Sequence, residues 1–375
     1  MSNKKNTAMT FGSHVKELAK SDFITYGVVI AAFIIVSIFS SSGLLGRKAA
    51  GLLVPVCCYI VMALSLNLTV GIMGELSLGH AGFMSVGAFS GVIASMLLGE
   101  VIDNNVIRLA VAILVGAFFA AIVGFLIGIP VLRLRGDYLA IVTLAFGEII
   151  KDLINCLVVG IDKNGLHIIF NFKGDKSAAD LNLAEGGKAI IKGAQGATGT
   201  DKIATFAAGF VLILIALFII QSLVRSRVGR AIIACRDNRI AAESVGIDVM
   251  KYKMFAFVLS AAIAGSAGAL YGANYSNLVA TKFDFNTSIL ILVFVVLGGL
   301  GNMLGSVIAA TVLYILPEAL REFANYRMLI YAIVLILVMI LTNNPRLVAL
   351  REKLFSGVSS VFKKGKKKSE SEGGK

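Results

Sequence analysis

The sequence predicts an all-α polytopic membrane protein with eight to ten transmembrane helices. Of its 375 residues, 57% are hydrophobic and only 15% are charged, and the hydrophobic residues fall in long runs. A soluble domain carries about 25% charged residues, whereas a helix that crosses the hydrocarbon core of a bilayer needs about 20 consecutive apolar ones. The composition therefore excludes a soluble enzyme of two domains.

Nine apolar runs are candidate spans. The first follows 22 mostly polar residues, a longer lead than signal peptides usually have, so we treat it as a retained helix. The eighth is broken at its centre by Gly298, Gly299 and Gly301, which favours two short helices that either re-enter the membrane or each cross it. The runs lie near residues 23–40, 50–72, 77–98, 106–132, 138–160, 203–224, 254–279, 287–316 and 328–342.

Outside these runs, Lys and Arg gather in four segments, two in loops and two at the ends of the chain, and these segments determine the predicted orientation. Cytoplasmic loops of membrane proteins are enriched in Lys and Arg. Counting crossings from a cytoplasmic N-terminus puts residues 133–137 and 225–253 on the cytoplasmic side and residues 161–202 outside. The C-terminal tail is also cytoplasmic if the glycine-broken run forms a hairpin or crosses twice. With the segments 1–22 and 346–375, the two cytoplasmic loops hold 22 of the 35 Lys and Arg and the entire net charge of +13, which favours membrane topology over nucleic-acid binding.

Polar residues at membrane depth are candidates for a translocation pathway. Asn67, Gly79 and His80 lie in the glycine-rich stretch 64–89, which covers the end of the second run and the start of the third, and Glu148 lies about three turns into the fifth. Ionisable residues within spans usually face the bundle interior or a water-filled cavity. A structural interpretation stays open for each: the stretch forms a cytoplasmic turn in which Glu75 is solvated and His80 bonds to the backbone, and Glu148 pairs with Lys151 one turn further on.

The short link after the fourth run has the pattern of an interfacial anchor, built from Arg133, Arg135 and Asp137. Residue sets for catalysis or metal binding do not occur: the three histidines are scattered, the four cysteines lack metal-ligand spacing, and no phosphate-binding loop is present. We therefore expect no catalytic residue, no metal site and no cofactor bound by this chain.

Loop 225–253 contains a predicted short helix. Asp237 or Asn238 can cap its start by accepting backbone N–H groups. Residues 240–245 continue the helix, and Gly246 can end it in the left-handed conformation. A helix of about two turns is too short to be stable alone, so it must dock against its own protein or against a partner.

Around this helix the sequence resembles a known family. AAESVGI, in which Glu243 stands three residues before Gly246, is similar to the coupling loop of ABC importer permeases. Four longer blocks between about residues 50 and 320 resemble the branched-chain amino acid permease family, specifically its LivM-type subunit. They are LNLTVGIMGELSLGHAGFMSVGAF, RLRGDYLAIVTLAFGEII, RAIIACRDNRIAAESVGIDVMKYKMFAFVLSAAIAGSAGALY and ILVFVVLGGLGNMLGSVIAA.

The resemblance implies that residues 23–345 form an ABC importer permease domain, which the cytoplasmic segment 1–22 precedes. The basic tail 346–375 is extra to the family pattern, and its charge predicts a disordered cytoplasmic segment attracted to anionic membrane lipid. Such a permease is a multi-pass protein of a prokaryotic cytoplasmic membrane and not an enzyme. It works with a second, LivH-like permease, two cytoplasmic ATPase subunits that bind ATP and magnesium, and an external solute-binding protein. The resemblance places five residues in the ATPase-coupling loop: Arg236, Asp237, Ala242, Glu243 and Gly246.

Three functions are compatible with these observations. The first is import of leucine, isoleucine and valine by alternating access. The second is import of urea or short amides by a related ABC permease, because the external loop 161–202 departs from the family pattern and leaves the solute open. The third is an ion-coupled carrier, which would need Glu75, His80 and Glu148 to form a relay and would leave the cytoplasmic helix without a role.

Overall fold

The structure, a computed structural model, describes residues 25–39, 42, 46–99, 102–134, 136–162, 165–171, 181, 187–320 and three pairs between 329 and 336. The predicted terminal segments 1–22 and 346–375, Arg135 and most of the run 328–342 lie outside these residues. The chain divides into two compact units, Met1–Val312 and Leu313–Lys375. The site lies in the first unit.

Helices account for most of the first unit. Six of those described are long and apolar enough to cross a membrane, which supports a polytopic membrane protein. The total of eight to ten crossings stays a prediction. The helices are Thr25–Phe39, α2 (Arg47–Asn67), η1 (Leu68–Met73), α3 (His80–Leu98), α4 (Asn105–Val131), α5 (Asp137–Asn155), α6 (Phe206–Arg225), α7 (Arg227–Asp237), α8 (Arg239–Ser244), α9 (Val249–Gly272), η4 (Ala280–Lys282), α10 (Phe285–Gly298) and α11 (Met303–Ala319).

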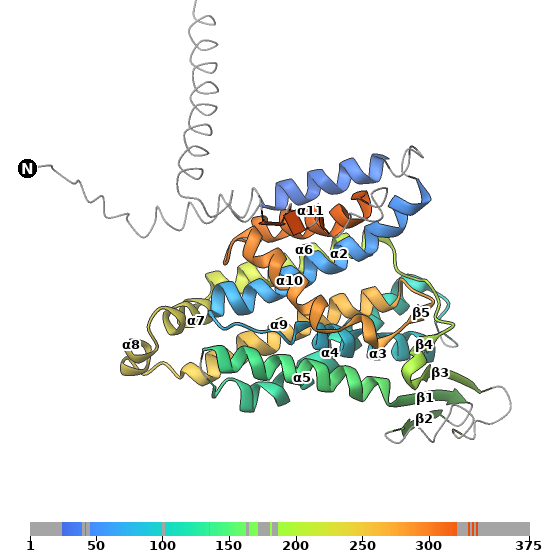
Figure 1. Cartoon of the computed structure of the whole chain (residues 1–375), viewed down its shortest axis with the longest axis horizontal. Helices are drawn as coiled ribbons and strands as arrows, with labels where there is room; N and C mark the ends of the chain where they lie inside the picture. The colour runs from blue at the N-terminus through green and yellow to red at the C-terminus, as the bar shows by residue number, and fades with distance from the viewer. Residues whose placement is uncertain are drawn as a thin grey trace, which may run out of the picture. The chain divides into compact units, whose positions relative to one another are not determined.

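The core forms where α9 packs against α2, α3 and α4 (Figure 1). Small residues allow the close approach: a Cβ atom added to Gly87 of α3 or to Gly268 of α9 would lie less than 3.0 Å from the backbone of the opposite helix. In a bilayer, such contacts let van der Waals packing hold helices together without a hydrophobic driving force. These glycines of α3 and α9 therefore allow the two helices to pack closely.

The glycine-broken run forms two helices, as predicted. α10 ends at Gly298 and α11 begins at Met303. Gly299 and Gly301 have positive φ angles of 95° and 81°, a conformation that L-residues with side chains rarely adopt. Whether the pair crosses the membrane or re-enters stays a prediction.

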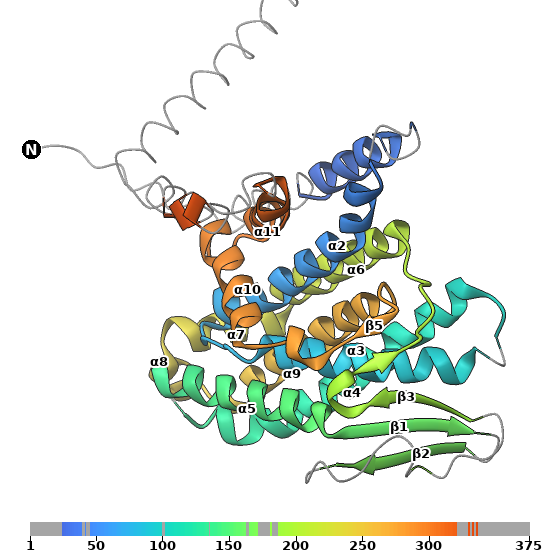
Figure 2. The ribbon, with the colours of Figure 1, turned by 45° about the vertical axis from the view of Figure 1, so that its right-hand side comes forward.

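The prediction of an all-α fold is wrong for four strands between residues 157 and 198 and for a fifth at 277–278, which form an antiparallel sheet with the order β2-β1-β3-β4-β5 (Figures 1 and 2). The fifth apolar run accordingly does not stay helical to residue 160, because α5 ends at Asn155 and β1 begins at Leu157. A short apolar run with β-branched residues such as Val158 and Val159 fits a buried strand as well as a helix end. The strands are β1 (Leu157–Asp162), β2 (Gly165–Phe170), β3 (Lys188–Lys192), β4 (Ala197–Thr198) and β5 (Asn277–Leu278), with a 3-10 turn, η3 (Gly193–Gln195), after β3.

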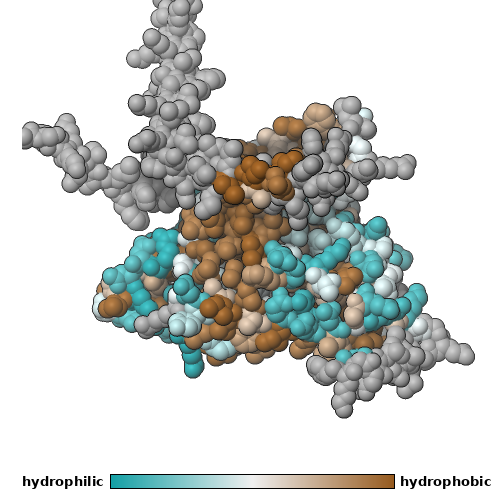
Figure 3. Space-filling view, viewed as in Figure 1, coloured by the Kyte–Doolittle hydropathy of each residue, from teal (hydrophilic) through white to brown (hydrophobic). Residues whose placement is uncertain are grey.

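Hydrophilic surface gathers at two ends of the face in Figure 3, over α7 and α8 at one end and over the region of the sheet at the other, with a hydrophobic band between them. A band of this kind is what the hydrocarbon core of a bilayer would cover. The arrangement favours opposite sides of the membrane for loops 161–202 and 225–253.

Candidate functional site

A buried hydrogen-bond network joins α2, η1, α3 and α9 around the hydroxyl of Ser260. Ser260 Oγ donates to the carbonyl of Ser65 at 2.7 Å, and it accepts from Thr69 Oγ1 at 2.8 Å. Its remaining lone pair faces His80 Nε2 at 2.9 Å. Because the Ser260 hydroxyl has already donated its proton to Ser65, we assign the proton of this bond to His80 Nε2. His80 Nδ1 then accepts from Ser77 Oγ at 3.3 Å. This assignment makes His80 a neutral, fully bonded residue that fixes the start of α3.

Gly79 has a packing role in the same corner. A Cβ atom at Gly79 would overlap the carbonyl oxygen of Thr143 in α5. The neighbouring backbone N–H of Leu78 donates to Thr143 Oγ1 at 3.0 Å. Gly79 is therefore needed where the start of α3 touches α5.

Asn67, at the end of α2, holds the turn between α10 and α11. Its side chain is fully buried, with 0% exposed. Oδ1 accepts from the backbone N–H of Gly301 at 2.8 Å, while Nδ2 donates to Asn302 O at 3.2 Å and to Ser306 Oγ at 2.9 Å. One amide thus bonds two backbone groups of the glycine break and a hydroxyl in the first turn of α11.

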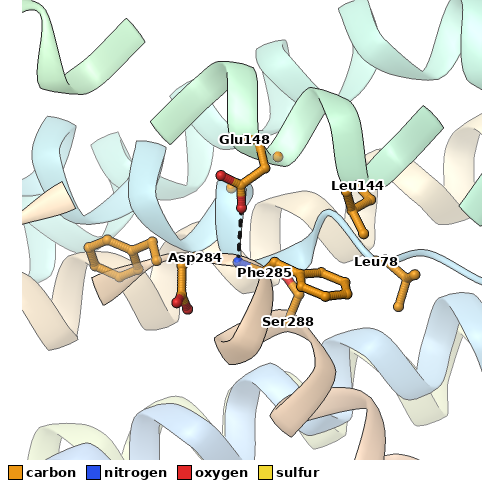
Figure 4. A pocket seen from close by; sticks show the side chains of 9 residues that line it. Leu78, Leu144, Glu148, Asp284, Phe285 and Ser288 are labelled. Atoms are coloured by element: carbon orange, nitrogen blue, oxygen red, sulfur yellow. Dashed lines mark hydrogen bonds between the residues drawn. The ribbon is translucent and has the colours of Figure 1, made fainter. Parts of the chain in front are cut away.

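Glu148 joins α5 to the start of α10. Its carboxylate forms an ion pair with Lys151, as the structural interpretation expected, and its Oε1 also accepts the backbone N–H of Phe285 at 2.9 Å (Figure 4). Asp284 caps the same helix by accepting from Thr287 N at 3.0 Å. Glu148, Asp284 and Phe285 line a shallow pocket with about 170 Å³ of empty space, in which no part is wide enough for a water molecule.

Glu75 corrects one expectation, because it is not a solvated turn residue. It forms an ion pair with Lys253 of α9, and the two side chains are only 17% and 11% exposed. Glu75, His80 and Glu148 therefore each have a separate partner. In the described part of the chain no hydrogen bond or ion pair joins these three side chains, so the geometry does not form the relay that an ion-coupled carrier would need.

The predicted interfacial anchor is described in part. Arg133 and Asp137 are exposed on the two sides of the link between α4 and α5. Gly136 has a positive φ angle of 59°, and Asp137 is the first residue of α5, where a negative charge interacts favourably with the helix dipole. Among the described residues, no group of three or more His, Cys, Asp or Glu side chains could hold a metal ion.

The predicted short helix in loop 225–253 is α8, and a second helix, α7, precedes it. Asn238 separates the two and caps α8 by accepting from Ala241 N at 3.0 Å. Gly246 follows α8 with a positive φ angle of 83°, as predicted. α9 then starts at Val249, earlier than the predicted residue 254, because Asp248 caps it by accepting from Lys251 N at 3.1 Å.

Ala242 anchors α8 to the rest of the protein. It packs in a small buried cluster with Cys235 and Val249, and Ile247 covers this cluster. Burial raises the pKa of the Cys235 thiol, so this cysteine acts as a packing group and not as a nucleophile. Of the five residues placed in the coupling loop, Ala242 thus supports the helix from within.

The outer face of α8 forms an exposed tip. Ile240 is 80% exposed and Val245 is 74% exposed, although both are large apolar residues. Between them Glu243 accepts from Arg239 Nε at 2.8 Å, on the helix surface. We name Ile240, Glu243, Val245 and Gly246 the α8 tip. Sequence reasoning missed Ile240 and Val245. Ile240 lies two residues from Ala242, on the opposite side of the helix, whereas Val245 follows the end of α8 and no helical spacing places it.

Arg236, which the resemblance places in the coupling loop, bonds to the backbone of its own chain while its side chain stays 38% exposed. Its Nη1 donates to the carbonyl of Gly71 in η1 at 2.9 Å. Asp237 holds the other side of the guanidinium, accepting from Nε at 3.0 Å and from Nη2 at 2.9 Å. Arg236, oriented by Asp237, therefore joins α7 to η1. The Asp237 side chain, which is 63% exposed, and the α8 tip both remain at the surface.

Comparison with known proteins identifies the family. The model of the permease component of the branched-chain amino acid transport system matches residues 48–341. The chain belongs to this family. The matched range contains all the candidate residues named above, from Asn67 to Gly246.

Three members of known name show how the chain relates to the branched-chain amino acid permeases. It is 35% identical to the high-affinity permease protein LivM of Escherichia coli K12 over 292 residues, which are 75% of this chain and 66% of that protein. It is 27% identical to the probable LivM of Methanocaldococcus jannaschii over 295 residues, 72% and 79% of the two chains. It also matches the probable LivH of the same archaeon, 32% identical over 110 residues, 29% of this chain and 34% of LivH.

The match thus spans slightly less than two thirds of the Escherichia coli relative. No solved structure matches this permease chain.

Proposed function

We propose that the chain is the membrane-spanning subunit of an ABC importer that moves branched-chain amino acids by alternating access. The observation that carries the proposal is the α8 tip, in a chain of the branched-chain amino acid permease family. A tip with two exposed apolar side chains is costly in water and suits a partner's cleft. An ion-coupled carrier acting alone would have no use for it.

The proposal includes a set of partners. Two ATPase subunits, which bind ATP and magnesium, receive the α8 tip on the cytoplasmic side. A LivH-like permease completes the pathway within a prokaryotic cytoplasmic membrane, and a solute-binding protein docks on the outside. The partial match to LivH supports the pairing, because the two kinds of permease share sequence over part of this chain. The sheet at the other end of the hydrophobic band supplies a surface for the binding protein.

Reconstitution tests the substrate and the energy source together. The chain is coexpressed with the products of its neighbouring genes, and the purified complex is placed in proteoliposomes that contain ATP. We expect uptake of labelled leucine, isoleucine or valine that requires ATP and the binding protein. Uptake of urea or a short amide in their place would contradict the proposed solute, and uptake by the chain alone under a proton or sodium gradient would contradict the ABC mechanism.

A Glu148→Gln variant separates the importer from a carrier. Gln can still accept the Phe285 N–H and loses only the ion pair with Lys151, in which Glu148 is 33% exposed. Because partly exposed ion pairs contribute about 1 kcal/mol or less, initial uptake should fall by less than about fivefold. The control is Asp152→Asn, whose carboxylate lies 3.8 Å from the same lysine. A loss of more than about a hundredfold at pH 6 and pH 8, in Glu148→Gln alone, would favour a carrier.

A further inference from the structure

On one side, residues 67–75 contact loop 225–253, which holds α7, α8 and the start of α9. Arg236 of α7 donates to the carbonyl of Gly71 at 2.9 Å, and the aliphatic part of the same side chain lies against Gly74, which has a φ angle of 79°. At the end of the stretch, Glu75 pairs with Lys253 near the start of α9. Two cations from the elements that flank α8 thus bind one short segment.

The other side of residues 67–75 contacts the glycine break between α10 and α11. Asn67 bonds to Gly301, Asn302 and Ser306. One turn further on, Gly71 lies so close to Gly301 that a Cβ atom at Gly71 would be less than 3.0 Å from the Gly301 backbone N. Gly71 is therefore in contact with Arg236 through its carbonyl and with Gly301 through its Cα.

The segment between these contacts is not an ordinary helix. Residues Leu68–Met73 form η1, a π-helix that continues α2, and Gly74 ends it in the left-handed conformation. A π-helix is less regular than an α-helix, occurs mostly as single turns and is frequent at functional sites. A turn of this kind can change its hydrogen-bond pattern with little rearrangement of the helix before it.

We propose that η1 transmits movements of α7 and α8 to the glycine break between α10 and α11, through Arg236 on the cytoplasmic side and Asn67 on the other. Both are positioning residues: Arg236 fixes the Gly71 carbonyl, and Asn67 fixes the backbone from Gly301 to Ser306. The proposal rests on the proposed function only for the cause of the movement, namely ATPase subunits at the α8 tip. The route itself belongs to this chain.

Hydrogen exchange tests the route without a transport assay. The chain, with whatever subunits copurify, is placed in lipid nanodiscs, and exchange is followed by mass spectrometry. We expect Arg236→Gln to speed exchange of residues 299–306 by about threefold or more, because the local opening free energy falls when the carbonyl of Gly71 is released. The matched control is Arg230→Gln in the same helix, since Arg230 Nη1 donates only to the nearby Arg225 O at 3.0 Å.

Each outcome decides the proposal. Faster exchange at 299–306 in Arg236→Gln and normal exchange in Arg230→Gln support it. A change confined to residues 71–75 overturns it, as does an equal change in both variants. If Arg236→Gln does not fold, Arg236→Lys keeps the charge and the aliphatic contact with Gly74 and should give a smaller change in the same peptides; no change there overturns the route. Failure of the reconstituted complex to import any amino acid would count against the proposed function and leave these exchange results unaffected.

Discussion

An Ile240→Glu variant should lose both its ATPase subunits and its uptake, with a drop of at least about tenfold in each. Ile240 is 80% exposed at the α8 tip, so the chain itself makes few contacts with it. Burying an isoleucine side chain in a partner stabilises a complex by about 1.5–3 kcal/mol. A carboxylate at that position would lose this contribution and would also have to be desolvated in the cleft. The measurement is copurification of the ATPase subunits, together with ATP-dependent uptake.

The control for this prediction is Arg230→Glu, an exposed position of α7 that receives a larger change of charge. It should keep the ATPase subunits to within about twofold, because a single exposed charge contributes little. Both variants should reach the membrane in normal amounts. Normal copurification of the ATPase subunits with Ile240→Glu would show that the α8 tip is not the docking surface.

Local sequence signals were sufficient for several elements. As predicted, Asn238 caps the start of α8 and Gly246 follows its end. These two signals are local, since a capping side chain and a left-handed glycine act within a few residues of the chain. The break between α10 and α11 was predicted for the same reason, because Gly299 and Gly301 adopt backbone conformations that few other residues tolerate. Such signals do not depend on the tertiary structure.

The sheet could not be predicted from local signals. β1 has the composition of a helix end, and its partner β3 lies beyond a long polar stretch of the sequence. β5 comes from the other side of α9, at Asn277–Leu278, and pairs with β4 through only two residues. A strand of two residues has no periodicity, so its pairing is fixed by the helices that bring the segments together.

The candidate site shows the same division. Asn67 and His80 were recognisable as polar residues at membrane depth, but their partners are far away in the sequence: Gly301 for Asn67 and Ser260 for His80. Periodicity cannot show which distant residue faces them. Arg236 was placed in the coupling loop by resemblance, but its bond to Gly71, 165 residues earlier in the chain, could not be predicted from local sequence.

Replacing Asn67 by Leu should strongly destabilise the protein. The amide makes three hydrogen bonds near the glycine break, and Leu would remove all three. The Gly301 N–H would lose its partner, whereas the Asn302 carbonyl would still accept from the Ser306 N–H and from Ser306 Oγ, each at 3.1 Å. Unsatisfied buried groups cost about 1–3 kcal/mol each, and hydrogen bonds between transmembrane helices contribute about 0.6 kcal/mol on average. We expect a loss of about 2–5 kcal/mol. In detergent the melting temperature should fall by about 5 °C or more.

Ser85 provides the matched control, because both side chains are 0% exposed and polar. Ser85 Oγ has no hydrogen-bond partner among the described residues, in contrast to the three bonds of Asn67. Ser85→Ala should therefore leave the melting temperature unchanged or raise it slightly, since removing an unsatisfied hydroxyl removes its desolvation cost. Equal falls in melting temperature for Asn67→Leu and Ser85→Ala would mean that the cost depends only on burial of the side chain. Asn67 would then not hold the break between α10 and α11.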